Sequence, residues 1–189
     1  MKNPAPPLLR CYQGVTLIEL MVAITVLAVL AGIGIPAFSN LMRSSQIAAE
    51  ANNLVAALTL ARSEAMKRGV RVSVCPSNGD PDDGCTDDWG DGYLVFSDDF
   101  GDAGKLEDPD NDVPIQFFSA PANGVTVVTE ADSVVFMPSA ALFDSARSFS
   151  ISKAGCHGSQ RRVVDVAPTG RIGLTRVDCA MEEEEESGS

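Results

Sequence analysis

Residues 15–35 read VTLIELMVAITVLAVLAGIGI, a run that is apolar apart from two threonines, two glycines and Glu19. At about 1.5 Å per residue, a helix of this length spans roughly 30 Å, the thickness of the hydrocarbon core of a bilayer. The preceding residues 1–14 contain Lys2 and Arg10 but no acid, and basic residues beside a span stay in the cytoplasm. The run therefore predicts one membrane-spanning helix, with the rest of the chain exported.

Glu19 is the one charged residue of this run. A carboxylate in the middle of a membrane helix costs about 2.5–3.5 kcal/mol on insertion scales, so it needs a physical reason. One interpretation is that Glu19, close to the start of the run, reaches the interface. The other is a cationic partner, because cleavage after Gly14 gives Val15 a new α-amine that is positively charged at neutral pH. The residues alone leave both interpretations open.

The segment Gly14–Leu20, GVTLIEL, resembles the GFTLIEL signature of type IV prepilins and pseudopilins. In that family a prepilin peptidase cleaves after the glycine and methylates the new amine, and the glutamate aids assembly by meeting a neighbouring subunit's N-terminus. The resemblance implies cleavage between Gly14 and Val15, N-methylation of Val15 and an assembly role for Glu19. Val15 stands where phenylalanine is usual. The implied partners are prepilin peptidase, other minor and major pilins or pseudopilins, and the inner membrane.

After Pro36 the apolar residues recur at helical spacing, and most polar residues fall on other faces. The apolar stripe is Ala51, Leu54, Val55, Leu58, Ala61 and Ala65, and the polar positions are Gln46, Glu50, Asn53 and Lys67. We expect one long helix over 16–68, loosened near Pro36 because proline lacks a backbone donor, and ended by Gly69. Its membrane half is followed by an amphipathic half, whose stripe requires a sheet to cover it.

Two further segments carry a narrower resemblance. Leu60–Gly69, LARSEAMKRG, is similar to a run of the GspH/FimT (FimT/FimU) family of minor pilins and minor pseudopilins. Trp89–Phe96, WGDGYLVF, is similar to the W-x-x-G-[WY]-x-V-F stretch of the same family. We expect Trp89 to pack over an edge of the sheet, with ligand stacking as the alternative.

From residue 70 onward, short β-runs alternate with turn residues. The expected strands are 70–75, 93–96, 113–118, 125–128, 134–137, 149–152, 163–166 and 170–176. A long N-terminal helix packed on antiparallel β-sheets gives an α+β, pilin-like fold. We divide the chain into a cleaved prepilin leader (1–14), a transmembrane and assembly helix (15–35), a periplasmic globular domain (36–180) that includes the amphipathic half of the helix, and an acidic disordered tail (181–189).

Cys11 belongs to the leader, and its loss leaves an even number of cysteines in an exported domain, which favours disulfides. The four remaining cysteines can form two disulfides in three different ways. Closeness in sequence favours Cys75–Cys85 and Cys156–Cys179, each of which closes a loop between strands. A zinc site made of all four thiolates is the alternative, and it is disfavoured because neither pair has the short C-x₂-C spacing.

The chain has a formal charge of −12, which becomes −14 when Lys2 and Arg10 leave with the leader. A charge of this sign argues against a general nucleic-acid binder. Thirteen acids lie from Asp80 to Asp112, which predicts a long solvated loop. Asp108–Asp112 has the alternate acids of a calcium loop but lacks its glycine and final glutamate, so a plain acidic surface is favoured over an irregular calcium site.

Some FimT-like minor pilins bind DNA through a G-R-x-R motif near the last cysteine. The matching stretch here is Gly170–Gly173, GRIG, in which glycine replaces the second arginine. We expect Arg161, Arg162 and Arg176 to lie near one another on adjacent strands. DNA contact through Arg171 and Arg176 is therefore an alternative to ordinary strand residues on a solvated face, and the weaker one, because phosphate binding needs several cations.

The sequence holds no G-x-S-x-G elbow, no phosphate-binding glycine loop and no H-E-x-x-H motif, and its one histidine, His157, lies beside glycines in an expected loop. We expect no catalysis, no cofactor and no metal. The resemblance implies a structural minor pilin of type IV pilus assembly, in a tip or priming complex, anchored in the bacterial inner membrane with its C-terminal domain in the periplasm. A minor pseudopilin of type II secretion is the first alternative, and a DNA-binding minor pilin of natural transformation is the second.

Overall fold

The computed structural model describes residues 15–80, 84–99, 101–106, 112–122 and 124–179, and of residues 33–37 only the helical backbone. The expected leader, 1–14, and the expected acidic tail, 181–189, therefore lie outside the described residues. The chain divides between Ser39 and Asn40 into two compact units. The described part of the first unit is helical from Leu17 on, and the second unit holds the rest of that helix and all the described strands.

Helix α1 runs over Leu17–Arg68, 52 residues without interruption, and includes position 36. The prediction of one long helix is confirmed. Near its end the nitrogens of Lys67 and Arg68 lie 3.2 and 2.6 Å from the carboxylate of Glu64. The Arg68 guanidinium, and then Lys67, lower the pKa of Glu64 below its ordinary value. Gly69 follows with a φ of +73°, the left-handed conformation that ends many helices.

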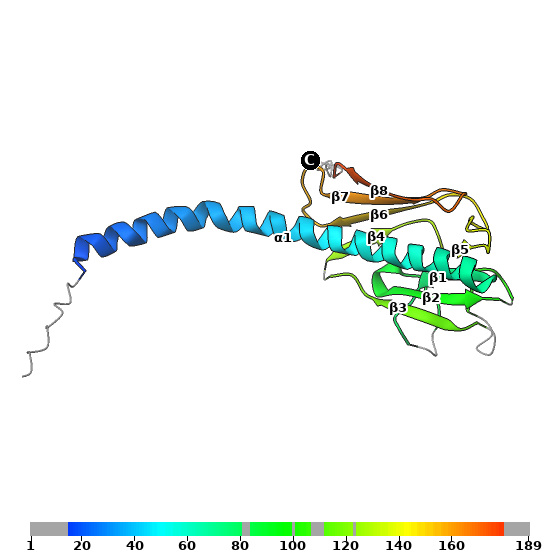
Figure 1. Cartoon of the computed structure of the whole chain (residues 1–189). Coiled ribbons are helices and arrows are strands. Elements are labelled where there is room, and N and C mark those ends of the chain that lie inside the picture. Colours follow the sequence, from blue (N-terminus) through cyan, green and yellow to red (C-terminus); the bar gives the residue numbers. More distant parts are fainter. Residues whose placement is uncertain (1–14, 81–83, 100, 107–111, 123, 180–189) are drawn as a thin grey trace, which may run out of the picture. The chain divides into compact units, whose positions relative to one another are not determined.

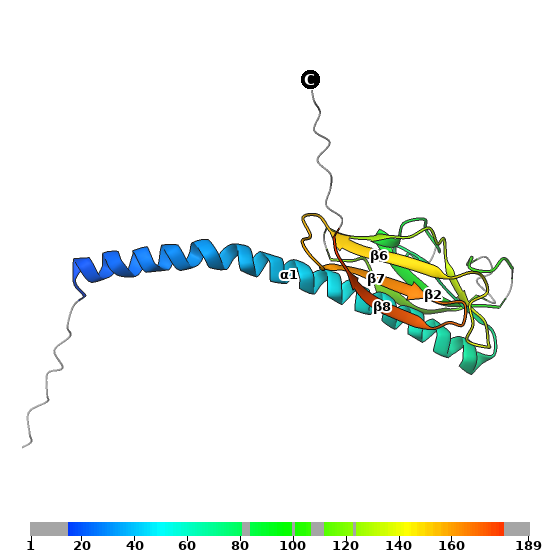
Figure 2. The same ribbon diagram turned by 90° about the horizontal axis from the view of Figure 1, so that it is seen from above.

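Eight strands form two four-stranded antiparallel sheets, which we call sheet A and sheet B. The order in sheet A is β3-β2-β1-β5, and in sheet B it is β4-β6-β7-β8. Figure 2 shows β6, β7 and β8 running side by side. A 3-10 helix, η1 (Trp89–Asp91), comes just before β2. The strand bounds are β1 Arg71–Pro76, β2 Gly92–Asp98, β3 Pro114–Ser119, β4 Val125–Val128, β5 Val134–Phe136, β6 Arg147–Lys153, β7 Arg161–Val166 and β8 Ile172–Val177.

All eight expected strands are present, and the α+β prediction is confirmed. The expectation for 125–128 matches β4, and the other strands begin or end up to two residues away from their expected limits. The pairing partner sets these ends. β6, for example, extends to Arg147 and Lys153 because these residues pair with Val166 of β7 and Val125 of β4.

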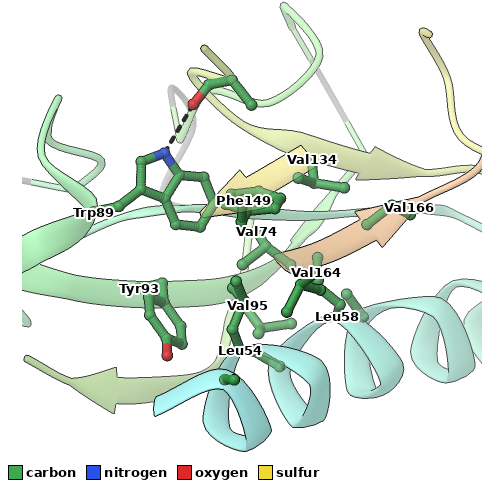
Figure 3. Packing of buried hydrophobic residues seen from close by; sticks show 14 of the residues in the cluster. Leu54, Leu58, Val74, Trp89, Tyr93, Val95, Val134, Phe149, Val164 and Val166 are labelled. Atoms are coloured by element: carbon green, nitrogen blue, oxygen red, sulfur yellow. Dashed lines mark hydrogen bonds between the residues drawn. The ribbon is translucent and has the colours of Figure 1, made fainter. Parts of the chain in front are cut away.

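The core lies where the second half of α1 meets both sheets, with β6–β8 on one side of the helix and β1–β3 on the other (Figure 1). Figure 3 shows Leu54 and Leu58 of the helix facing Val95 and Val164 from the two sheets. The buried helix residues are Ile47, Ala51, Leu54, Ala57, Leu58, Ala61 and Ala65. The predicted stripe is thus confirmed, except that Val55 is only partly buried. Small alanines allow the helix to approach the sheets closely.

The prediction that Glu50 lies off the buried face is wrong. Glu50 is 2% exposed, and its carboxylate accepts a hydrogen bond from the hydroxyl of Tyr93 on β2, which is also buried. Burial, and then this carboxylate, raise the pKa of Tyr93 well above its ordinary value. The pair ties α1 to sheet A. Helical periodicity could not reveal it, because the partner lies 43 residues away in sequence.

Trp89 does not pack over a sheet edge as expected. It is 4% exposed, and its ring lies edge-on to Phe149 of β6 with centroids 4.9 Å apart. The centroid of Tyr93 lies 6.0 Å away on β2, and the indole Nε1 donates to the carbonyl of Ala131 at 2.8 Å (Figure 3). Trp89 therefore joins the two sheets through the core. Its ring and its one donor are both used there, which leaves no face open for ligand stacking.

Candidate functional site

The first turn of α1 carries most of the residues singled out by the N-terminal motif. Gly14 and its bond to Val15 lie outside the described residues. Thr16 caps the helix: its Oγ1 accepts from the backbone N–H of Glu19 at 3.3 Å, and its carbonyl accepts from Leu20 at 3.1 Å. Thr-x-x-Glu is the pattern of a capping box, a signal that the sequence analysis missed. Glu19 lies in the first turn, where the helix dipole favours an acid.

Apolar side chains surround Glu19 on every face of the helix. Val15 and Ile18 are each 71% exposed. The other large apolar side chains of the run are exposed as well: Leu17, Leu20, Met21, Val22, Ile24, Val26, Leu27, Val29 and Leu30. Thr25 donates its hydroxyl to the carbonyl of Met21, so its polar group is satisfied within the helix. A helix that is apolar all round needs an apolar surrounding.

Among the described residues, no helix is both long enough and apolar enough to cross a membrane. The last part of the expected span, 33–35, lies outside the residues whose side chains are described.

Two disulfides tie the loops of the second unit. Cys75–Cys85 joins β1 to the loop before η1, and Cys156–Cys179 joins the turn after β6 to the chain after β8, with Cα separations of 5.6 and 6.0 Å. These are the two pairs that the sequence spacing favours. Cys75 is fully buried against Leu94 and Phe96, whereas both cysteines of the second bridge are half-buried. Within the part of the chain that the structure describes, no cluster of His, Cys, Asp and Glu has the arrangement of a metal site.

The acidic segment from Asp80 to Asp112 is not wholly solvated, contrary to expectation. Asp98, at the end of β2, is fully buried and accepts from Ser73 Oγ at 2.5 Å and from Arg71 at 3.1 Å. Asp112 is fully buried as well. These acids help to hold the fold, because a buried carboxylate is retained only when hydrogen-bonded or paired. Residues 108–111 of the calcium-like pattern lie outside the described residues.

Of the arginines considered for DNA contact, Arg162 of β7 and Arg176 of β8 are cross-strand partners, as expected, but Arg171 is not brought to them. Arg171 precedes β8 and Arg176 lies five residues on, so they are about 17 Å apart at the rise of an extended strand. Arg162 is 4% exposed and donates from Nη1 to the carbonyls of Ser159 and Gln160 at 3.1 and 2.8 Å. Burial, and then the charge of Arg176, lower the pKa of Arg162. Arg162 therefore holds the turn before β7 and is not available to a phosphate.

Gly170, the first residue of the GRIG stretch, is required by packing. It is buried with a φ of +73°, and a Cβ there would overlap the carbonyl oxygen of Ala140 and come within 3.2 Å of Arg62 Nε. Ala140 itself has a φ of +66°, which is rare outside glycine. Helix α1, the turn at 137–141 and the turn at 167–171 thus meet at Gly170, and the glycine is explained without a ligand.

His157 lies in the turn between β6 and β7, as expected, and is exposed. Its backbone N–H donates to Oε1 of Gln160 in the same turn, at 3.1 Å. It follows Cys156, so the second disulfide fixes this turn. The position is that of a solvated turn residue.

Two family models match the chain. The model described as type II transport protein GspH matches residues 50–170, and the model described as the prokaryotic N-terminal methylation motif matches residues 9–35. The first covers more than half of the chain, and the chain belongs to the GspH family. The second spans Gly14, Val15 and Glu19, and this motif implies processing by a prepilin peptidase. Helix α1 runs through both matched regions.

The chain is similar to solved structures of pilin-type proteins. The type IV minor pilin FimU of Pseudomonas aeruginosa (strain PAO1) gives a TM-score of 0.54 at 22% identity, over 69% of this chain and 89% of FimU. A second crystal form of FimU gives 0.50 at 23% identity, over 66% and 89% of the two chains. The minor pseudopilin EpsH from the type 2 secretion system of Vibrio cholerae gives 0.48 at 14% identity, over 69% and 97%. A comparison with curated proteins found no match.

The family and the fold place the chain among pilin-type subunits, which are structural proteins that assemble with other pilins. The helix packed on two antiparallel sheets is the pilin-like α+β fold of FimU.

Proposed function

We propose that this protein is a structural minor pilin that takes part in type IV pilus assembly, in a tip or priming complex, and is not an enzyme. One observation carries the proposal: a single helix joins the methylation motif to the GspH domain. The second half of that helix is buried in its own domain, whereas the described side chains of the first half are exposed and apolar. Such a half can be buried only by lipid or by other subunits.

Before assembly, the helix over 15–35 lies in the inner membrane and the domain over 36–180 lies in the periplasm. Prepilin peptidase cleaves between Gly14 and Val15, and Val15 becomes N-methylated. Glu19 then meets the α-amine of a neighbouring subunit. The proposal is supported by the chemistry of the first turn, where an exposed carboxylate among apolar side chains gains most from a cation in a surrounding of low dielectric.

The pilus is supported by the fold shared with the minor pilin FimU, a likeness of fold alone. The second candidate is a minor pseudopilin of type II secretion, which the description of the matching family favours. Both candidates need the same processing and the same use of Glu19. DNA binding is not proposed, because Arg171 and Arg176 lie apart and Arg162 is buried.

A clean deletion with complementation separates the two candidates, with surface pili, protein secretion and DNA uptake measured in the same strain. We expect loss of pili with secretion intact. Loss of secretion with pili intact supports the pseudopilin instead, and intact pili and secretion contradict both. Loss of DNA uptake alone revives a role for Arg171, and a gel shift at low salt then tests it.

The role of Glu19 is tested by Glu19→Ala, which we expect to insert into the membrane and to be absent from the filament. The matched control is Thr16→Ala, which removes the cap of the same turn and keeps the carboxylate. We expect this control to be incorporated. If both variants are incorporated equally, the proposed pairing of Glu19 is wrong.

A further inference from the structure

The two disulfides of the second unit differ in how well the fold shields them. Cys75 is fully buried in an apolar cluster, and Cys85 packs against the same cluster. A Cβ at Gly84, the residue before Cys85, would meet the side chain of Leu106 at 3.5 Å, so this side of the bridge is covered as well. A reductant must bring a thiolate to one of the two sulfurs, and this bridge leaves little room for its approach.

The second bridge lies at the surface. Cys156 packs against the core from one side, and both Cys156 and Cys179 are half-buried. Gly155 precedes Cys156 and Gly158 follows it two residues later, and both glycines are exposed and have no side chain to cover the bridge. Nothing among the described residues lies within 4 Å of a Cβ at Gly158, and the atoms nearest to one at Gly155 belong to the flexible side chain of Arg43. The described part of the chain therefore leaves this bridge open to a thiolate.

Opening the second bridge breaks no strand pairing. Cys156 lies in the β6–β7 turn, which we define as residues 154–160, and Cys179 lies after β8, so both are outside the paired residues of sheet B. Two hydrogen bonds hold the same segments without the bridge. The N–H of Cys179 donates to the carbonyl of Gly158 at 2.8 Å, and the N–H of Cys156 donates to the carbonyl of Lys153 at 3.0 Å. Loss of the bridge should therefore loosen the β6–β7 turn and leave the sheets folded.

The β6–β7 turn holds helix α1 close to the start of its buried half. Arg43 of the helix donates from Nη1 to the carbonyl of Gly155 in the turn at 2.5 Å. Just before the turn, Nζ of Lys153 donates to Oε1 of Gln46 at 2.8 Å. Ile47 is the first buried residue of α1 among those whose side chains are described. The second bridge thus fixes a turn that in turn fixes the helix where it enters the core.

We propose that Cys156–Cys179 is a redox-sensitive clasp, which a dithiol reductant opens while Cys75–Cys85 stays closed. One thiolate of the reductant attacks a sulfur of the bridge, the S–S bond breaks, and the other cysteine leaves as a thiolate that takes a proton. The second thiolate of the reductant displaces the bound cysteine, so two electrons and two protons pass to the cysteines and the reductant becomes a disulfide. The open form keeps both sheets and holds α1 less firmly near Arg43. The inference rests on the proposed function only in placing the domain outside the cytoplasm, where disulfides persist.

Timed reduction of the purified full chain tests the order in which the bridges open. The chain carries Cys11→Ser and is kept in mild detergent with dithiothreitol, and free thiols are blocked with N-ethylmaleimide at intervals and located by peptide mass. We expect Cys156 and Cys179 to be blocked at least about tenfold faster than Cys75 and Cys85. Equal rates, or the reverse order, refute the clasp. The same series in urea is the control, because a difference that persists in the unfolded chain refutes an origin in the fold.

Amide hydrogen exchange tests what the clasp holds. The variant with Cys156→Ala and Cys179→Ala represents the open form, and the oxidised parent chain is the control. We expect exchange in the β6–β7 turn and over residues 40–46 of α1 to be at least about threefold faster in the variant, with the emission of Trp89 unchanged. Unchanged exchange in either segment refutes the clasp, and a shifted emission refutes an open form that keeps its fold. Neither readout involves pili or secretion, so failure of the clasp and failure of the proposed function give different results.

Discussion

Replacing Gly170 by alanine destabilises the fold in two ways, through a strained backbone and through a steric overlap. Gly170 and Gly69 have the same φ of +73°, so an alanine at either position must hold a left-handed backbone, which costs about 1–2 kcal/mol. The space around them differs. Nothing lies within 4 Å of a Cβ at Gly69, whereas a Cβ at Gly170 overlaps the carbonyl oxygen of Ala140. Gly69→Ala is therefore the matched control.

The overlap adds the larger cost. The carbonyl of Ala140 belongs to the main chain and cannot rotate away, so the turn that carries it must shift. That turn is held by hydrogen bonds from Ala140 N–H to the carbonyl of Met137 at 2.8 Å and from Leu142 N–H to the carbonyl of Pro168 at 2.9 Å. Overpacking of this kind costs about 1–3 kcal/mol, so Gly170→Ala is expected to lose about 2–5 kcal/mol in all.

Urea unfolding of the chain in mild detergent measures both losses, followed by the fluorescence of Trp89. Trp89 is the one tryptophan and lies in the core between the two sheets, so its emission reports the unfolding of the second unit. Equal losses for Gly170→Ala and Gly69→Ala would refute the close approach of the two turns. A larger loss for Gly170→Ala also matters for function, because any loss of function in this variant is then a folding defect and not a sign of DNA contact.

Two further predictions concern the core and the disulfides. Because the pKa of Tyr93 is raised in the fold, the stability that this proton linkage contributes is complete below about pH 10 and falls by up to about 1.4 kcal/mol per pH unit above it. Tyr93→Phe should remove this fall when urea unfolding is measured below and above about pH 10, and a fall that persists in the variant contradicts the assignment. Each disulfide should contribute about 3 kcal/mol, and replacing Cys75–Cys85 by alanines should cost more than replacing Cys156–Cys179, because Cys75 is fully buried. Thermal unfolding of the two double variants measures the order, and the reverse order contradicts it.

The fold was predictable where local pattern decides it. The spacing of Ala51, Leu54 and Leu58 placed the buried face of α1, and each β-run between turn residues became a strand. Glu50 and Trp89 were misplaced for one physical reason. Their positions depend on partners far away in sequence, Tyr93 for the acid and Phe149 for the indole ring, and periodicity carries no information on such partners.

The candidate site, too, could be predicted from the sequence only where a local pattern decides it. The N-terminal motif is a continuous stretch, so its residues could be named before any coordinates, and the helix cap at Thr16 was readable there too from the Thr-x-x-Glu pattern. The burial of Asp98 and Arg162 was not readable. An acid in an acidic loop and an arginine in a strand look solvated until Ser73 or the carbonyls of a turn are seen to satisfy them.

The mass of the native protein and the sequence of its N-terminus test the central claim most directly, since assembly through α1 depends on a new α-amine close to Glu19. Protein purified from pili or from the inner membrane should begin at Val15 and carry one added methyl group on that amine. A native chain that begins at Met1, or that begins at Val15 and is absent from every filament fraction, would contradict the account.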